Sequence, residues 1–210
     1  KYDGSGSAGT IGHQLNDTPG MVWVKIRSTT GFNWKVLHKD LTGFGTYMLS
    51  LDSSGAETAA SASWFNSTAP TSSVISLGSL LAVNGSNEEY ICYAFASVNS
   101  YSSIGKYVGN GNADGPMVTT SFRPAFILTK GIDDAEDWYI RDTARSPFNE
   151  VDKSLRPNDA GSEYSGRKID ILSNGFKIRD SDSQINENGK SYLYYAVAEN
   201  PFQANGGLAR

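Results

Sequence analysis

The sequence contains the same unit twice. Residues 1–8, KYDGSGSA, return as residues 106–113, KYVGNGNA, and residues 89–96, EYICYAFA, correspond to residues 191–198, SYLYYAVA. The offset is 105 residues for the first pair and 102 for the second, so insertions and deletions fall in loops while the apolar segments persist. A period of this length is far above the roughly 20 to 50 residues of solenoid repeats. The repeat therefore predicts a duplication of a domain-sized unit.

The predicted units are residues 1–100 and residues 106–210, joined by a polar seam around residues 99–105. About 100 residues suffice for a hydrophobic core in each unit. Because the seam is too short for a flexible linker, we expect the units to pack against each other.

Strands are the predicted elements of both units. Apolar residues alternate with period two or form short β-branched and aromatic runs between turn residues. The expected strands lie at residues 21–27, 34–38, 47–52, 61–65, 73–77 and 89–98, and at residues 117–121, 125–130, 137–142, 169–172, 176–179 and 191–199. Helical turns are expected only at residues 57–62 and 149–155. The predicted fold class is an all-β sandwich.

Composition excludes several classes of partner. Charged residues make up 19% of the chain and the net charge is −4, so the clustered basic face that nucleic acids require is absent. The longest apolar run, residues 90–96, is too short to insert into a membrane. The single Cys92 has no partner for an intrachain disulfide and is interpreted as a small buried residue. The chain opens on Lys1 without an initiating Met, so we expect it to belong to a longer protein.

Motifs for catalysis and cofactor binding are weak. The loop GSGSAG at residues 4–9 has the glycine spacing of a dinucleotide site, but no helical pattern follows it to receive a pyrophosphate. His13 and His38 are the only histidines, too few for a catalytic zinc site. No Gly-x-Ser-x-Gly elbow supports a serine hydrolase. We therefore predict no enzyme activity, no cofactor and no metal.

Acidic and aromatic residues also have structural interpretations. The acidic runs at residues 133–137 and 180–182 place carboxylates next to each other rather than across a cleft, as a glycosidase would need. A solvated hairpin tip is the favoured interpretation, with an oxygen-ligated calcium site as the alternative. Trp34 and Trp138 recur at equivalent positions and are interpreted as core residues.

A candidate binding site follows the strand predicted at residues 137–142. The connection from Thr143 to about Gly166 exceeds the usual length of roughly 4 to 6 residues, and long loops on a rigid sandwich commonly carry function. Aromatic faces and bidentate polar groups are the chemistry that holds sugars. The predicted glycan-binding residues around this connection are Arg141, Asp142, Arg145 and Tyr164. The alternative is that Asp142 and Arg145 form an ion pair that pins the loop.

Several longer phrases carry a family resemblance. These segments of the second unit are YVGNGNADGP, FRPAFILTK, WYIRDTARSPFNEVDKSLRPN, LSNGFKIRDSDSQIN and SYLYYAVAENPF. They resemble the C-terminal region of a family of tailed-bacteriophage virion proteins. This family is common in marine phages and contains a domain of unknown function. GHQLNDTPGMVWVKIRS in the first unit resembles a preceding copy of the same module. The pattern Asp142-Thr-x-Arg145 is replaced at residues 38–40 by His-Lys-Asp, so any role of that Asp and Arg belongs to the second unit.

This resemblance implies a virion structural protein, part of a tail fibre or appendage, with a concanavalin-like or jelly-roll sandwich that presents loops to a host-surface glycan. It supplies no catalytic residues. The alternatives are an architectural capsid-decoration or adaptor module and a glycan depolymerase. The implied partners are other virion proteins and further copies of the chain, in a homotrimer with apolar contacts from Tyr101, Phe148 and Phe202.

Overall fold

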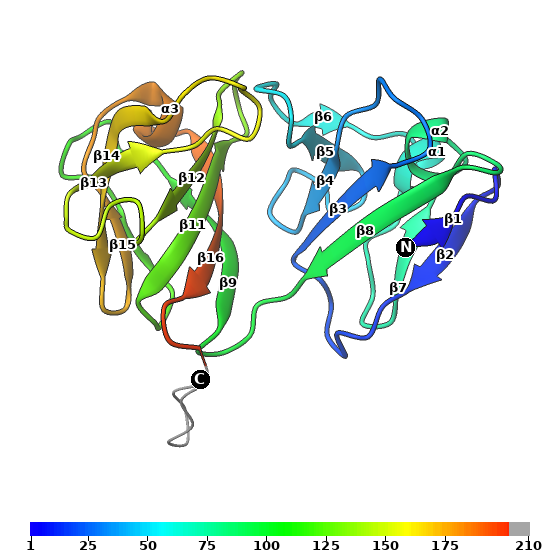
Figure 1. Cartoon of the computed structure of the whole chain (residues 1–210), viewed down its shortest axis with the longest axis horizontal. Helices are drawn as coiled ribbons and strands as arrows, with labels where there is room; N and C mark the ends of the chain where they lie inside the picture. Colours follow the sequence, from blue (N-terminus) through cyan, green and yellow to red (C-terminus); the bar gives the residue numbers. More distant parts are fainter. Residues whose placement is uncertain (202–210) are drawn as a thin grey trace. The chain divides into compact units, whose positions relative to one another are not determined.

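Antiparallel strands dominate both halves of the chain (Figure 1). The computed structural model describes residues 1–201, and the chain divides into one unit at Lys1–Ala96 and a second from Ser97 onward. Each unit has a hydrophobic core of its own. The prediction of an all-β sandwich is confirmed. None of the helices in residues 1–201 is long and apolar enough to cross a membrane.

The first unit contains a six-stranded sheet in the order β1-β8-β3-β4-β5-β6 and a two-stranded sheet of β2 and β7. Its strands are β1 (Tyr2–Asp3), β2 (Gly9–Gly12), β3 (Met21–Ile26), β4 (Lys35–His38), β5 (Tyr47–Ser50), β6 (Thr58–Ala59), β7 (Val74–Leu77) and β8 (Glu89–Phe95). Two single-turn helices complete the unit, α1 (Ala62–Phe65) and α2 (Leu81–Asn84).

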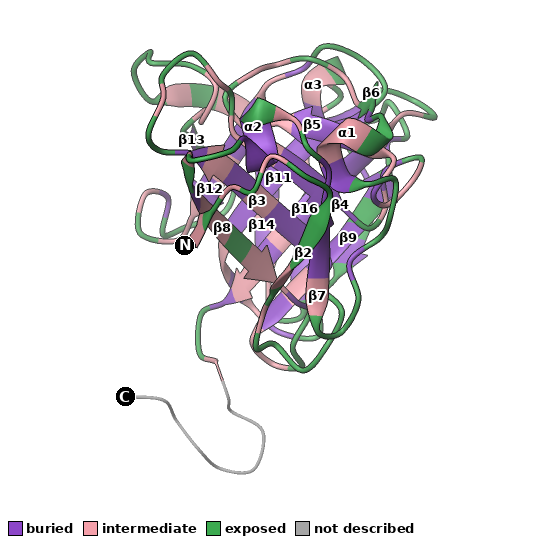
Figure 2. Ribbon diagram, turned by 90° about the vertical axis from the view of Figure 1, so that its right-hand side faces the viewer, coloured by how far each residue is buried: buried purple, intermediate pink, exposed green. Residues whose placement is uncertain are grey.

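The core of the first unit lies between these two sheets. Successive side chains of a strand point to opposite faces, so Val22, Val24 and Ile26 of β3 all point inward. Ile75 of β7 packs against them from the other sheet, and Phe65 of α1 joins the same cluster. Buried stretches, purple in Figure 2, follow the strands.

The second unit has two four-stranded sheets, in the orders β9-β16-β11-β12 and β10-β15-β14-β13. Its elements are β9 (Ser102–Val108), β10 (Met117–Thr119), β11 (Pro124–Gly131), β12 (Trp138–Asp142), β13 (Val151–Ser154), β14 (Tyr164–Leu172), β15 (Gly175–Ile178), α3 (Ser183–Asn186) and β16 (Ser191–Ala198). Ile127 and Tyr192 from one sheet meet Ile169 and Phe176 from the other in a single core.

The strand order β1-β8-β3-β4 of the first unit matches the order β9-β16-β11-β12 of the second. The pair β2 and β7 likewise matches β10 and β15. After β4 and β12 the units differ: β5 and β6 extend the first sheet of their unit, whereas β13 and β14 extend the second.

A buried asparagine joins the glycine loop to α2 in the first unit. Asn84 is 3% exposed, and its side-chain amide donates to the carbonyls of Ser7 (2.7 Å) and Gly78 (2.8 Å). Its Oδ1 accepts from the backbone N–H of Ser5 (2.9 Å). Gly4 lies so close to α2 that an added Cβ would sit 2.0 Å from the carbonyl of Gly85. The glycines thus allow the loop to approach the helix, which is their role here.

The second unit makes the same contacts with Asn186. The amide of Asn186 donates to the carbonyls of Asn112 (2.7 Å) and Asp180 (2.8 Å), and its Oδ1 accepts from the N–H of Asn110 (2.9 Å). A Cβ on Gly109 would meet the carbonyl of Glu187 at 2.2 Å. We call these two arrangements the asparagine latches, centred on Asn84 and Asn186.

A tyrosine from the last strand of each unit supports its latch. The hydroxyl of Tyr90 donates to the carbonyl of Leu81 and accepts from the N–H of Gly85 (2.7 Å). In the second unit the corresponding hydroxyl belongs to Tyr192, which bonds Ser183 and Glu187. Each of these rings also stacks on a tyrosine from the first strand of its unit, Tyr2 at 5.0 Å and Tyr107 at 5.1 Å.

Four short segments differ from the sequence prediction. Residues 62–65 form α1 rather than a strand, with Ser61 as its N-cap and Phe65 as its buried side chain. Strands β6 and β13 replace the helical turns expected at residues 57–62 and 149–155, and both pair with a neighbouring strand. The seam at residues 99–105 is partly strand β9, which pairs with β16.

The two recurrent tryptophans lie in different surroundings. Trp138 is 2% exposed, as expected for a core residue. Trp34 is only half-buried, and its ring stacks on Tyr93 at 6.1 Å. The interpretation as a core residue is therefore confirmed for Trp138 and wrong for Trp34.

Candidate functional site

Arg141, on β12, points into the second unit. Its side chain is fully buried, with Nη2 donating to the carbonyl of Arg167 (2.8 Å) and Nη1 to the hydroxyl of Thr129 (3.2 Å). Burial lowers the pKa of the guanidinium to about 10. Arg141 therefore bonds structural partners in the interior and does not reach the surface.

Asp142 and Arg145 form the ion pair considered from the sequence. Arg145 Nε lies 3.3 Å from Asp142 Oδ2, and the backbone N–H of Arg145 donates to Asp142 Oδ1 (2.7 Å). Arg145 Nη1 lies 2.7 Å from Glu163 Oε2, so one guanidinium joins two carboxylates. These contacts connect the segment after β12 to the segment before β14.

Tyr164 begins β14 and contacts two arginines. The Arg167 guanidinium lies 4.6 Å from the centre of the Tyr164 ring and 5.2 Å from that of Tyr139, and the Arg156 guanidinium lies 5.3 Å from the Tyr164 ring. Both distances to Tyr164 suit cation–π contact. We call Tyr139, Arg141, Arg156, Tyr164 and Arg167 the arginine–tyrosine cluster.

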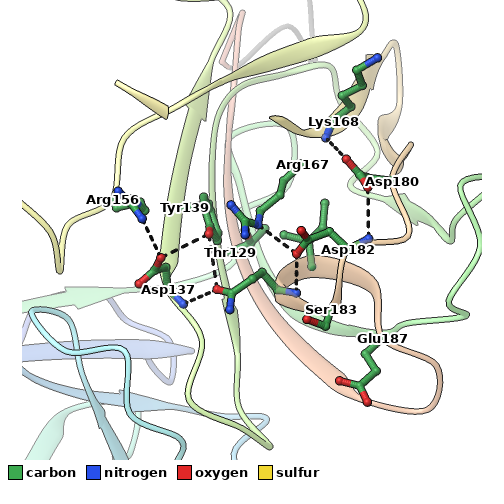
Figure 3. Close-up of polar contacts among 12 residues, drawn as sticks. Thr129, Asp137, Tyr139, Arg156, Arg167, Lys168, Asp180, Asp182, Ser183 and Glu187 are labelled. Atoms are coloured by element: carbon green, nitrogen blue, oxygen red, sulfur yellow. Dashed lines mark hydrogen bonds and ion pairs between the residues drawn. The ribbon is translucent and has the colours of Figure 1, made fainter. Parts of the chain in front are cut away.

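Acidic partners neutralise two arginines of this cluster. Arg167 Nε lies 3.0 Å from Asp182 Oδ1, and Arg156 Nη1 lies 3.0 Å from Asp137 Oδ2 (Figure 3). Asp182 also caps α3 by accepting from the N–H of Gln184 (2.9 Å). The side chains of the cluster therefore contact one another and their acidic partners, and these contacts connect β12, β14 and α3.

The sequence reasoning missed the ion pairs of Arg156 with Asp137 and of Arg167 with Asp182, because the partners lie 19 and 15 residues apart in the chain. It also expected one long loop from Thr143 to about Gly166. That prediction is wrong, since β13 divides the stretch and pairs with β14. The segment between β12 and β13 covers only residues 143–150, and Tyr164 belongs to a strand.

The acidic run at residues 133–137 is only partly a solvated tip. Asp133 and Asp134 are exposed, but Glu136 is buried, and burial raises the pKa of its carboxyl to about 7. Asp137 accepts from Arg156 and Asn158. Within residues 1–201, no group of three or more His, Cys, Asp or Glu side chains is placed to hold a metal ion.

The first unit has a surface hollow that the sequence did not predict. It has a volume of about 320 Å³ and lies between the β3–β4 loop, α1 and α2. Trp64 and Phe32 are half-buried in its wall, and Asn33 is exposed at its rim. The Lys35 ammonium lies 4.9 Å from the centre of the Trp64 ring and donates to Ser50 Oγ (3.1 Å). We call this feature the Trp64 hollow.

The charge in the Trp64 hollow is partly desolvated. Burial lowers the pKa of Lys35, while Asp52 acts in the opposite direction. The hollow thus combines aromatic surface, a cation held in place by a hydroxyl, and an exposed amide. This combination of groups can bind a polar ligand that has apolar faces.

A family model, Domain of unknown function (DUF7483), matches residues 1–201. The chain belongs to this family. No curated protein and no solved structure matches the DUF7483 chain.

Proposed function

We propose that this DUF7483 chain is a virion structural protein of a tailed phage, part of a tail fibre or similar appendage, that binds a host-surface glycan. The sequence resemblance to phage virion proteins supports the proposed place in the virion. The Trp64 hollow is the observation that carries the binding role, because it joins Trp64 and Phe32 with Lys35 and Asn33. The role is binding rather than catalysis.

Sugar chemistry matches the composition of the hollow. The C–H face of a pyranose packs on an indole or phenyl ring, and its hydroxyls need donors and acceptors beside that ring. Trp64 and Phe32 provide the rings. The Lys35 ammonium is already oriented by its contacts with Trp64 and Ser50, so little side-chain freedom is lost on binding.

An architectural role is the second candidate, and the arginine–tyrosine cluster favours it. Arg141 bonds only interior groups, and the Asp142–Arg145 pair binds two segments together. Such contacts stabilise a scaffold for neighbours in a virion. A homotrimer remains part of the proposal. Phe148, 82% exposed, is one candidate contact, and Phe202 lies outside the described residues.

The binding role is tested on an array of bacterial surface polysaccharides. We expect Trp64→Ala to weaken binding about fivefold or more, since aromatic packing against a ligand contributes about 1 kcal/mol or more. Asn33→Ala, at the exposed rim, should weaken binding without changing the melting temperature. Met117→Ala is the control, an exposed apolar side chain in the other unit. Unchanged binding by Trp64→Ala, or no binding by the wild type, would favour the architectural role.

A further inference from the structure

Lys35 gives the Trp64 hollow a positive charge. Among the residues that line the hollow in the described part of the chain, Lys35 is the only one with an ionisable side chain. One of its three ammonium protons is directed to Ser50 Oγ (3.1 Å). None of the ion pairs within residues 1–201 involves Lys35. The ammonium can therefore still donate to an anionic group that enters the hollow.

The second unit has cations in the corresponding region. β4 and β12 correspond in the sheet orders of the two units. Each lies directly after or at a recurrent tryptophan, which Lys35 follows in the first unit and Tyr139 follows in the second. The Arg167 guanidinium lies 5.2 Å from the centre of the Tyr139 ring. Both units thus place a positive charge beside the start of this strand.

The second unit supplies a carboxylate there, and the first does not. α2 and α3 are equivalent, since each ends on the asparagine of its latch. The N-cap of α3 is Asp182, which lies 3.0 Å from Arg167 Nε. The N-cap of α2 is Leu80, an apolar residue in the wall of the Trp64 hollow. The first unit therefore lacks the acidic residue that neutralises the cation of the second.

Asp52 does not take the place of that carboxylate. Its Oδ1 accepts from the backbone N–H of Trp34 (3.1 Å), and it does not line the hollow. Its charge raises the pKa of Lys35, against the larger effect of burial, without forming an ion pair with the ammonium. The charge of Lys35 is thus left without a direct counter-ion in the described residues.

We propose that the Trp64 hollow binds a glycan through a sugar residue that carries a carboxylate, such as a uronic acid. The carboxylate pairs with the Lys35 ammonium, as Asp182 pairs with Arg167 in the second unit, and the C–H face of the sugar packs on Trp64. Because Lys35 is half-buried, salt screens this pair less than a fully exposed one. This inference rests on the proposed function, since it names the class of sugar that the same hollow binds.

Acidic bacterial polysaccharides, each paired with its own methyl ester, test this inference. Esterification removes the charge and keeps the sugar ring, and the net charge of −4 disfavours nonspecific attraction of a polyanion. In a panel of uronic-acid polysaccharides, we expect the wild type to bind at least one acid about fivefold or more tightly than its ester, because a charge-assisted hydrogen bond is stronger than a neutral one.

Lys35→Gln should remove this preference and change the affinity for the ester by no more than about twofold. Thermal melting checks that the variant is folded. Lys106→Gln is the matched control, because it removes the same charge at an exposed position in the other unit, and it should keep the preference.

Equal binding of acids and esters by the wild type overturns the acidic sugar and leaves the proposed function intact, as does binding of neutral polysaccharides alone. A preference that survives Lys35→Gln overturns the role of Lys35. If the wild type binds no polysaccharide, acidic or neutral, both this inference and the proposed function fail.

Discussion

The two units share one half of their sandwich and differ in the other. The strands β1-β8-β3-β4 correspond in order to β9-β16-β11-β12, and both units carry an asparagine latch with matching distances. The half between β4 and β7, in contrast, contains α1 in the first unit, whereas the second unit has β13 and β14 between β12 and β15.

This difference separates the residues whose buried contacts stabilise both units from the residues that are particular to one unit. The shared half holds buried polar groups whose partners must all be present, so it tolerates little change. The differing segments contribute Trp64 of α1 to the Trp64 hollow in the first unit, and Tyr164 and Arg167 of β14 to the arginine–tyrosine cluster in the second.

The asparagine latches should give the largest losses of stability. We expect Asn84→Ala and Asn186→Ala each to lower the free energy of unfolding by about 3 kcal/mol, because several buried backbone groups lose their partner at once. Chemical denaturation of each variant measures this. Asn99→Ala, at an exposed position, is the control. Similar losses at Asn84 and Asn186 would support an equivalent role of the asparagine latch in both units. A loss at only one of the two sites would contradict it.

Arg141→Ala should destabilise the second unit by about 2 to 3 kcal/mol. The change leaves the hydroxyl of Thr129 and the carbonyl of Arg167 without this donor and creates a cavity in the interior. Thermal melting measures the loss, and polysaccharide binding by the folded variant should not change. Weaker binding at unchanged stability would instead place Arg141 in a ligand site.

Removing the hydroxyl of the latch tyrosines should have a smaller effect. Tyr90→Phe and Tyr192→Phe each keep the stacked ring but lose a donor and an acceptor to the backbone. We expect a loss of about 1 to 2 kcal/mol in each unit. Denaturation curves that show no change for either variant would mean that water replaces these contacts.

The Asp142–Arg145 pair should contribute least. Partly exposed ion pairs contribute no more than about 1 kcal/mol, so Asp142→Ala and Arg145→Ala should lower the melting temperature slightly. Host-cell adsorption by either variant should equal that of the wild type. Lost adsorption with an unchanged melting temperature would instead support the glycan site that the sequence predicted around Asp142 and Arg145.

Much of the fold was predictable because strand periodicity is local. The alternation of Val22, Val24 and Ile26 reveals β3 directly, and the returning motifs indicate the two units. The latches were not predictable, since Asn84 and Ser5 are 79 residues apart. β9 was missed because its sequence begins with small polar residues.

The candidate site was predicted less well. Tyr139 and Arg141 are two residues apart on one strand and so share a face, which was a sequence signal that Arg141 points inward with the tyrosine. The ion pair of Asp142 and Arg145 was foreseen as an alternative. The Trp64 hollow depends on α1, a segment that the sequence pattern assigned to a strand.

Fluorine NMR of the chain labelled with 5-fluorotryptophan can show whether a bound glycan contacts Trp64. The four tryptophans give four signals, and Trp64→Phe identifies the one from the hollow. Titration with a polysaccharide that the protein binds should shift the Trp64 signal alone. A shift of the Trp138 signal with an unchanged Trp64 signal would contradict a glycan site in the first unit.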